Sequence, residues 1–163
     1  MGASGAADVR PGQPAPYDLI ELFFFAYRDF VSDPDRILAD YGFGRAHHRV
    51  LHFVERQPGL TIAELLDILK ITKQSLNRVL KELVETGFVR VQEGQEDRRQ
   101  RLLFTTETGH DLAGRLVNLQ GERIDRALGS ASALERATVA RYLMGLIEPS
   151  DRATVEALIH RRV

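Results

Sequence analysis

Hydrophobic side chains recur with the period of an α-helix along most of this chain, and capping residues or glycine mark where the helices begin or end. The first such segment, residues 17–31, is apolar on more than one face and contains three consecutive phenylalanines at 23–25. A helix of this kind is usually buried from two sides. In a chain this short a second subunit can supply one of those sides, so the pattern favours a subunit interface over an ordinary core helix.

The same patterns predict the remaining elements. Helices are expected over residues 17–31, 34–40, 45–56, 61–69, 72–86, 106–128, 132–147 and 151–161. Thr61, Thr72 and Ser132 are the expected capping residues of three of them. Ser32-Asp33-Pro34 has the form of a new helix start and separates the first two. Alternating residues at 88–92 and 101–106 predict a two-stranded hairpin with a long polar tip.

Composition indicates one globular domain over residues 17–163, preceded by a disordered tail of Gly, Ala and Pro at 1–16. The 163 residues are 44% hydrophobic and 28% charged, which is ordinary for a soluble protein. The absence of Cys excludes a disulfide framework, a thiol redox sensor and a Cys-ligated metal site. No apolar run approaches the roughly 18 residues of a membrane helix and no signal peptide is recognised, so a cytoplasmic protein is expected.

A helix, a capped helix, a three-residue turn, a second helix and a hairpin follow one another in the order of a winged helix-turn-helix. The second helix of such a pair fits the major groove of DNA. Asn and Gln can bond to adenine edges, Arg to guanine, and Lys or Ser to phosphate. The candidate DNA-binding residues are Thr72, Lys73, Gln74, Ser75, Asn77, Arg78 and Lys81 in this helix and Arg98, Arg99 and Arg101 in the hairpin.

Positive charge is concentrated in the same segment. Residues 70–101 carry eight basic and five acidic side chains, a net charge of +3, although the whole chain carries −1. A polar helix face alone has a plain alternative interpretation, because any solvated helix is polar on one side. The basic hairpin beside it makes DNA binding the better interpretation.

These motifs resemble the MarR family of bacterial transcription regulators. The resemblance rests on TIAELLDILKIT at 61–72, TKQSLNRVLKELVETGFV at 72–89 and DRRQRLLFTTETG at 97–109. Asp97, Arg99, Thr106 and Gly109 match the family's wing pattern, whereas Thr105 stands where the family usually has Leu. The resemblance implies a mainly α fold with a small β-hairpin wing. Its winged helix DNA-binding lobe would cover residues 44–110, and dimerisation helices would cover 17–43 and 111–163.

The resemblance also implies function and partners. A homodimer would bind double-stranded DNA at a pseudo-palindromic operator, as a repressor released by a small-molecule effector. Arg99 would reach into the minor groove from the wing tip, and Asp97 would hold Arg99 or its neighbour in place. The family's effector pocket implies Tyr41, Arg45 and His48 as candidate contacts. Structural hydrogen bonds are the more ordinary role for Arg45 and His48.

Three other classes of function are weighed against this interpretation. Winged helices also serve as protein–protein docking modules, but the Arg-bearing wing and the Asn/Gln/Arg helix face favour DNA. His48 and His52 lie four residues apart on one helix face, and His110 could approach them, which suggests a metal-responsive regulator. Further ligands are not identifiable, so no metal or cofactor is predicted. No catalytic motif is found, so an enzyme is not expected.

Overall fold

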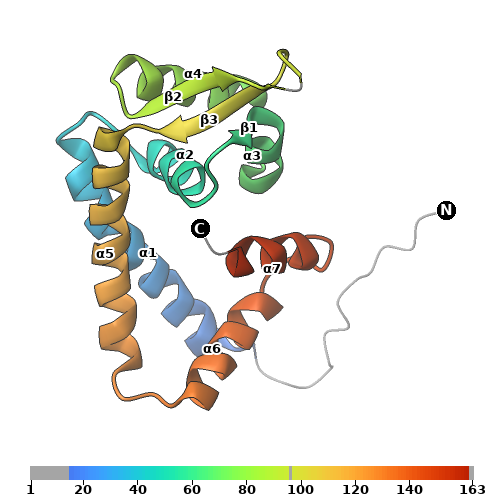
Figure 1. Cartoon of the computed structure of the whole chain (residues 1–163). Helices are drawn as coiled ribbons and strands as arrows, with labels where there is room; N and C mark the ends of the chain where they lie inside the picture. The colour runs from blue at the N-terminus through green and yellow to red at the C-terminus, as the bar shows by residue number, and fades with distance from the viewer. Residues whose placement is uncertain (1–14, 96, 162–163) are drawn as a thin grey trace.

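The computed structural model describes residues 15–95 and 97–161, so most of the tail expected over residues 1–16 lies outside the described residues. The elements are α1 (Tyr17–Ala39), α2 (Arg45–Arg56), β1 (Leu60–Thr61), α3 (Ile62–Leu69), α4 (Lys73–Glu85), β2 (Val89–Glu93), β3 (Arg101–Thr105), α5 (Glu107–Leu128), α6 (Ala133–Gly145) and α7 (Arg152–His160). We call residues 45–105, from α2 to β3, the lobe. Helices α1 and α5 descend from the lobe, and α6 turns back at the foot of α5 and leads to α7 (Figure 1). This arrangement confirms the predicted mainly α fold with a small β wing.

The first helix corrects one prediction. α1 is a single helix of 23 residues that passes through Pro34, so separate helices over 17–31 and 34–40 were wrong. Proline removes one backbone hydrogen bond from a helix interior. Packing compensates for this loss, because Pro34 and Leu38 are both buried and α1 packs against α5. Asp33, beside the proline, also accepts a hydrogen bond from Nε of Arg123 on α5 at 3.1 Å.

Local capping sets the helix-turn-helix, as predicted. The Thr61 hydroxyl accepts the N–H of Glu64 at 3.2 Å, and the Glu64 carboxylate accepts the N–H of Thr61 at 2.8 Å. α3 ends at Lys70, which adopts a left-handed conformation with φ 51°, and this conformation turns the chain toward α4. Thr72 then caps α4 by accepting the N–H of Ser75 at 3.2 Å.

The predicted hairpin is present, but it belongs to a larger sheet than expected. β2 and β3 pair antiparallel, with Val91 opposite Leu103, and β1 pairs with the other edge of β3, with Leu60 opposite Leu103. The sheet order is therefore β1-β3-β2. β1 contains two residues, which is too short for an alternating pattern to be recognised in the sequence.

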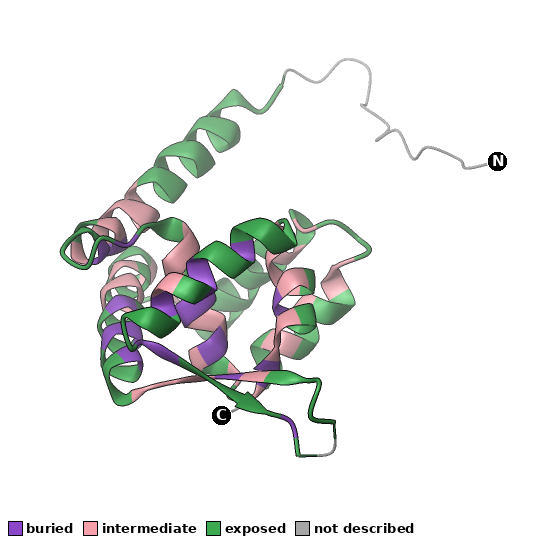
Figure 2. Cartoon of the chain, turned by 90° about the horizontal axis from the view of Figure 1, so that it is seen from above, coloured by how far each residue is buried: buried purple, intermediate pink, exposed green. Residues whose placement is uncertain are grey.

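The buried core lies inside the lobe and where α1 and α5 join it. Its fully buried side chains are Leu38, Val50, Leu51, Val54, Leu65, Leu76, Val79, Leu83, Val89, Leu103, Leu112 and Leu116. Figure 2 shows these buried positions on the inner sides of the helices, whereas the first half of α1 is exposed along its length. No polar or charged residue is buried within 15–95 and 97–161. The core therefore fixes which side of α4 faces inward.

The wing is joined tightly to α5. A Cβ on Gly109, in the first turn of α5, would lie 2.0 Å from the carbonyl oxygen of Phe88, so only glycine fits this approach. Thr106 caps α5 and also donates its hydroxyl to the carbonyl of Gly87 at 2.6 Å. The backbone N–H of Thr106 bonds to the carbonyl of Phe88 at 3.1 Å. The start of α5 and the start of the wing are thereby one packed unit.

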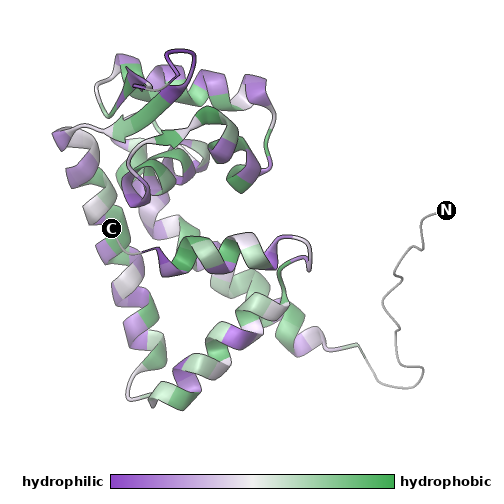
Figure 3. Cartoon of the chain, turned by 45° about the vertical axis from the view of Figure 1, so that its right-hand side comes forward, coloured by the Kyte–Doolittle hydropathy of each residue, from purple (hydrophilic) through white to green (hydrophobic). Residues whose placement is uncertain are grey.

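Helices α1 and α6 differ from the lobe because many of their large apolar side chains are exposed to solvent. Large hydrophobic residues are exposed along α1 and α6, namely Tyr17, Leu19, Ile20, Leu22, Phe23, Phe24, Phe25, Tyr27, Leu134, Val139, Tyr142, Leu143 and Leu146. α6 and α7, both described in full, contain no buried residue. Figure 3 shows the hydrophobic positions along α6. Among the described helices, none is long and apolar enough to cross a membrane.

Candidate nucleic-acid interface

α4 presents two different sides. Its inner side is held by the buried residues Leu76, Val79, Leu80 and Leu83, which fall at helical spacing. The predicted contacts on the outer side are all exposed, namely Thr72, Lys73, Gln74, Ser75, Asn77, Arg78 and Lys81. The structure therefore brings these residues together on the solvent side of one helix.

The outer side of α4 has polar groups available for a ligand. Within the described chain, the side chains of Lys73, Gln74, Asn77 and Arg78 form no hydrogen bond or ion pair with other residues. Thr72 and Ser75 are partly used in capping, because the Thr72 hydroxyl donates to the Ser75 hydroxyl at 2.9 Å. Lys81 lies 3.7 Å from Glu85, and such an exposed pair is weak enough to be exchanged for a phosphate.

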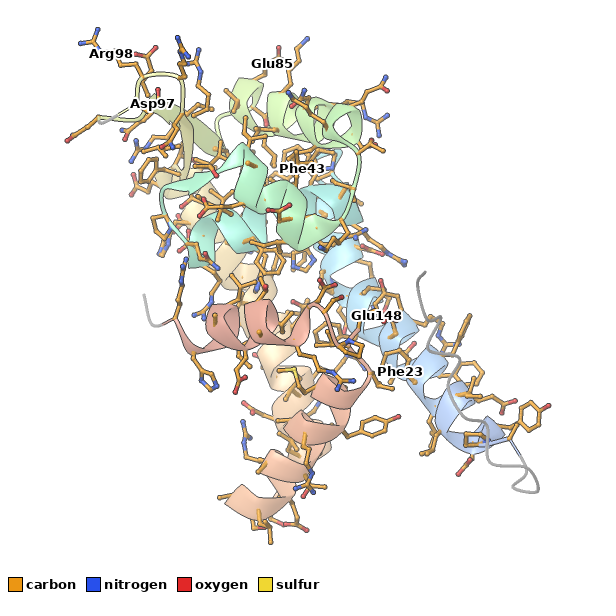
Figure 4. All side chains as sticks on the ribbon, turned by 90° about the vertical axis from the view of Figure 1, so that its right-hand side faces the viewer. Phe23, Phe43, Glu85, Asp97, Arg98 and Glu148 are labelled. Carbon is orange, nitrogen blue, oxygen red and sulfur yellow. The ribbon has the colours of Figure 1, made fainter. Side chains whose placement is uncertain are left out.

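The wing tip is an ordered turn that carries arginines. The Asp97 carboxylate accepts the backbone N–H of Arg99 at 2.9 Å, and the Gly94 N–H bonds to the carbonyl of Gln100 at 3.0 Å. Asp97 thus holds the backbone of Arg99 and leaves its guanidinium exposed. Arg101 lies 3.9 Å from Glu93 across the hairpin. Figure 4 shows Asp97 and Arg98 at the same end of the molecule as Glu85 of α4, with Phe23 and Glu148 lower down, away from this end.

One residue near this surface has no role assigned by the sequence analysis. His47 of α2 contacts α4 through its Nε2, which lies 2.6 Å from a carboxylate oxygen of Glu82. The two residues are 35 positions apart, and no local pattern connects them.

A cavity of about 270 Å³ lies where α1, α2 and α5 meet. Its lining includes Tyr27, Phe30, Arg45, His48, His52 and Gln120. Two of the three predicted effector contacts, Arg45 and His48, therefore lie together on this cavity. Burial lowers the pKa of His48 and of His52, because it disfavours the charged imidazolium.

The third predicted effector contact, Tyr41, is not part of the lining of this cavity. The Tyr41 hydroxyl accepts a hydrogen bond from Nη1 of Arg115 at 2.9 Å. Its ring packs edge-on against Phe88, with ring centroids 5.4 Å apart. Tyr41 follows the end of α1, and this packing turns it toward the wing base and away from the cavity lining.

The histidines considered as metal ligands are not gathered into one site. His48 and His52 lie on the cavity, whereas His110 bonds through Nδ1 to Glu55 at 2.6 Å. Over residues 15–95 and 97–161, no group of three or more His, Cys, Asp or Glu side chains is placed to hold a metal ion. The structure therefore gives no support to the metal-responsive alternative.

Comparison with known proteins decides the family. A model of the MarR family matches residues 41–100, which run from the loop before α2 to the wing tip. The HTH-type transcriptional regulator PetP of Rhodobacter capsulatus is 43% identical over 139 residues, which cover 85% of this chain and 84% of PetP. The chain belongs to the MarR family. Its members are transcriptional regulators, and this chain is accordingly a DNA-binding helix-turn-helix regulator.

Solved structures of MarR-family proteins share the fold. A putative MarR family regulator from Listeria monocytogenes, complexed with 26mer DNA, aligns with a TM-score of 0.69 at 21% identity, covering 89% of this chain and 97% of that one. Streptococcus pneumoniae FabT in complex with DNA aligns with a TM-score of 0.68 at 16% identity, covering 80% and 94%. At these identities the likeness shows the winged helix fold alone.

Proposed function

We propose that this MarR-family chain is a homodimeric, site-specific repressor that binds a pseudo-palindromic operator in double-stranded DNA and is released by a small-molecule effector. The observation that carries the proposal is the outer side of α4, where Lys73, Gln74, Asn77 and Arg78 are exposed without protein partners among the described residues, at the same end of the molecule as the basic wing tip. Amide and guanidinium groups on a helix are the chemistry that reads base edges in the major groove.

Each part of the interface has a separate task in this proposal. Asn77 and Arg78 contact base edges, and Lys73 and Lys81 contact phosphates. Arg99 enters the minor groove, where narrow grooves concentrate negative potential, and Asp97 holds the backbone of Arg99 by accepting its N–H. Arg98 and Arg101 add phosphate contacts at the wing. Residues 44–110 thereby serve as the DNA-binding unit.

Dimerisation rests on the exposed apolar side chains of α1 and α6. Such a large set of exposed aromatic and aliphatic residues marks a surface that another protein covers. A second copy of the chain, related by a two-fold axis, fits a pseudo-palindromic operator because each subunit then reads one half-site. Residues 17–43 and 111–163 are the segments assigned to this interface.

The cavity between α1, α2 and α5 is the proposed effector site. It lies where the helices assigned to dimerisation meet the lobe, so a ligand there changes the angle between the two. Arg45 supplies a positive charge at its rim, although Asp35 now accepts a hydrogen bond from Arg45 Nε at 2.9 Å. Aromatic walls from Tyr27 and Phe30 suit an aromatic anion.

A titration with labelled DNA tests the proposal. Fluorescence anisotropy is measured with the chain's own upstream intergenic DNA and with a scrambled duplex of equal composition, each at two salt concentrations. We expect tight binding to the upstream DNA and a loss of affinity at higher salt, because displaced counterions make phosphate contacts salt-dependent. Equal, weak binding to both duplexes would contradict site-specific recognition there and favour a protein docking module.

A further inference from the structure

α4 carries an acid beside its DNA-facing residues. Glu82 follows Lys81 directly and lies four positions after Arg78. Side chains four residues apart are neighbours on a helix surface, so a free Glu82 carboxylate is within reach of the Arg78 guanidinium. Some other contact must direct this carboxylate away if Arg78 is to serve the DNA.

His47 makes that contact. Its Nε2 lies 2.6 Å from Oε2 of Glu82, and its Nδ1 accepts the backbone N–H of Gly44 at 3.1 Å. Because Nδ1 is the acceptor, the ring proton resides on Nε2 and is donated to Glu82. The ring is stacked on Phe43, with centroids 4.7 Å apart and planes 13° apart, and its side chain is only 12% exposed. His47 is thereby fixed before any DNA arrives.

The ion pairs on α4 are consistent with separate roles for Glu82, which contacts α2, and Arg78, which faces solvent. Glu82 bonds to His47 on α2, and no described residue forms an ion pair with Arg78. The neighbouring Lys81 and Glu85, also four positions apart, do pair with each other at 3.7 Å. Arg78 and Glu82 have the same spacing as Lys81 and Glu85. They would be expected to form a similar ion pair if His47 did not hold the Glu82 carboxylate.

We propose that His47 is a positioning residue for DNA binding, because it holds the Glu82 carboxylate against α2 and so keeps Arg78 available to the DNA. The inference rests on the proposed role of the α4 surface. It assigns His47 a function through Glu82 and Arg78, with no contact between His47 and the DNA.

A mutant set tests the proposal on the full chain, with affinity for operator DNA measured by anisotropy at one salt concentration. His47→Ala is expected to weaken binding by about fivefold or more, the loss that accompanies one DNA contact. Adding Glu82→Gln to His47→Ala removes the misdirected charge, so affinity returns to within about twofold of Glu82→Gln alone. In an Arg78→Ala background, His47→Ala is expected to cause no further loss.

Two further variants separate positioning from folding. His110→Ala removes another histidine–glutamate pair with the same 2.6 Å separation, but one that joins α5 to α2, and it is expected to leave DNA affinity unchanged. His47→Phe keeps an aromatic ring on Phe43 and replaces His47→Ala if thermal unfolding shows that the alanine variant is not folded. A purely structural role for His47 predicts no rescue by Glu82→Gln.

The outcomes are distinguishable from a failure of the proposed function. If Arg78→Ala leaves affinity unchanged, the assigned role of Arg78 is wrong, and the inference about His47 falls with it. If Arg78→Ala weakens binding but His47→Ala does not, or if Glu82→Gln fails to restore affinity, only the positioning role is overturned.

Discussion

The lobe buries most of its large hydrophobic residues, whereas most of those on helices α1 and α6 are exposed to solvent. In the lobe, leucines such as Leu51, Leu65 and Leu76 are fully buried and polar side chains face outward. In α6 no residue is buried, and Leu134 is 75% exposed. Both regions are rich in leucine and other apolar residues. The difference is whether the chain itself supplies the covering surface.

This contrast indicates what each region requires for stability. The lobe and the ends of α1 and α5 that join it enclose one core, so a single chain is sufficient to form it. The first half of α1 and the whole of α6 expose their apolar surface to water, which is unfavourable unless another molecule covers them. The outer side of α4 is thus formed by a single chain, and in the proposed homodimer the contact between α1 and α6 of the two copies would set the spacing between their α4 helices.

The largest expected effect concerns assembly. Phe24, on α1, is 72% exposed, and Phe24→Glu places a charge on the proposed interface. Because a two-fold dimer contains two copies, losing about 1.5–3 kcal/mol at each raises the dissociation constant by about two to four orders of magnitude. Sedimentation equilibrium measures this shift. Gln92→Glu, at an exposed position of β2, is the matched control, and an unchanged dimer in Phe24→Glu would remove this part of α1 from the interface.

A core substitution in the lobe is expected to lower the stability of the fold itself, not the affinity between two copies of the chain. Leu51→Ala leaves a cavity at a fully buried site and is expected to lower the free energy of unfolding by about 3–5 kcal/mol. Urea denaturation followed by circular dichroism measures the loss, with the exposed Leu134→Ala as control. If the two leucine variants lost equal stability at a concentration where the protein is monomeric, the contrast between the regions would be wrong.

The two parts of the DNA surface should also differ from each other. Asn77→Ala is expected to relax the preference at one half-site position by about 1–3 kcal/mol, because a base contact is lost. Arg99→Ala should weaken binding across many sequences while leaving the dimer intact. Anisotropy titrations with operator variants and with scrambled DNA measure both effects. An equal loss on specific and scrambled DNA would reassign Asn77 to the phosphate backbone.

The smallest expected effect is a pH dependence of stability. The hydrogen bond that His110 Nδ1 donates to Glu55, together with the negative charge of that carboxylate, raises the pKa of His110 above the usual 6.5. A raised histidine pKa stabilises the folded state below the unfolded pKa, and this stabilisation disappears as the pH rises through the folded pKa. The melting temperature of the wild type should therefore exceed that of His110→Ala more at about pH 6 than at about pH 9. A difference that grew with pH would contradict this assignment.

The sequence was sufficient where structure depends on neighbouring residues. The caps at Thr61, Thr72 and Ser132 involve partners three positions away, and all three helices begin there as predicted. Pro34 was misinterpreted because its local pattern favours a helix start, whereas distant packing against α5 keeps α1 continuous. β1 was missed because only its pairing with β3, more than 40 positions later, defines it.

The residues of the candidate site also fall into two groups: those that local sequence predicts and those that depend on contacts in the folded chain. The outer residues of α4 were predictable because an amphipathic helix fixes its own outer side once its apolar stripe is known. Tyr41 was expected with Arg45 and His48 because the family's pocket lies near the start of this helix, but its ring packs against Phe88 and does not line the cavity. His47 and Glu82 belong to different helices, so their hydrogen bond exists only in the folded chain.

The contact between Gly109 and Phe88 has a mechanical consequence. Since no side chain separates Gly109 of α5 from Phe88 at the base of the wing, the wing is expected to move together with α5 when that helix tilts. α5 has 22 residues and, at 1.5 Å per residue, is about 33 Å long. A rotation of about 5° at its far end corresponds to about 3 Å at the wing over this length. A small tilt of α5 would therefore become a displacement as large as the length of a hydrogen bond at the wing, where Arg99 is exposed.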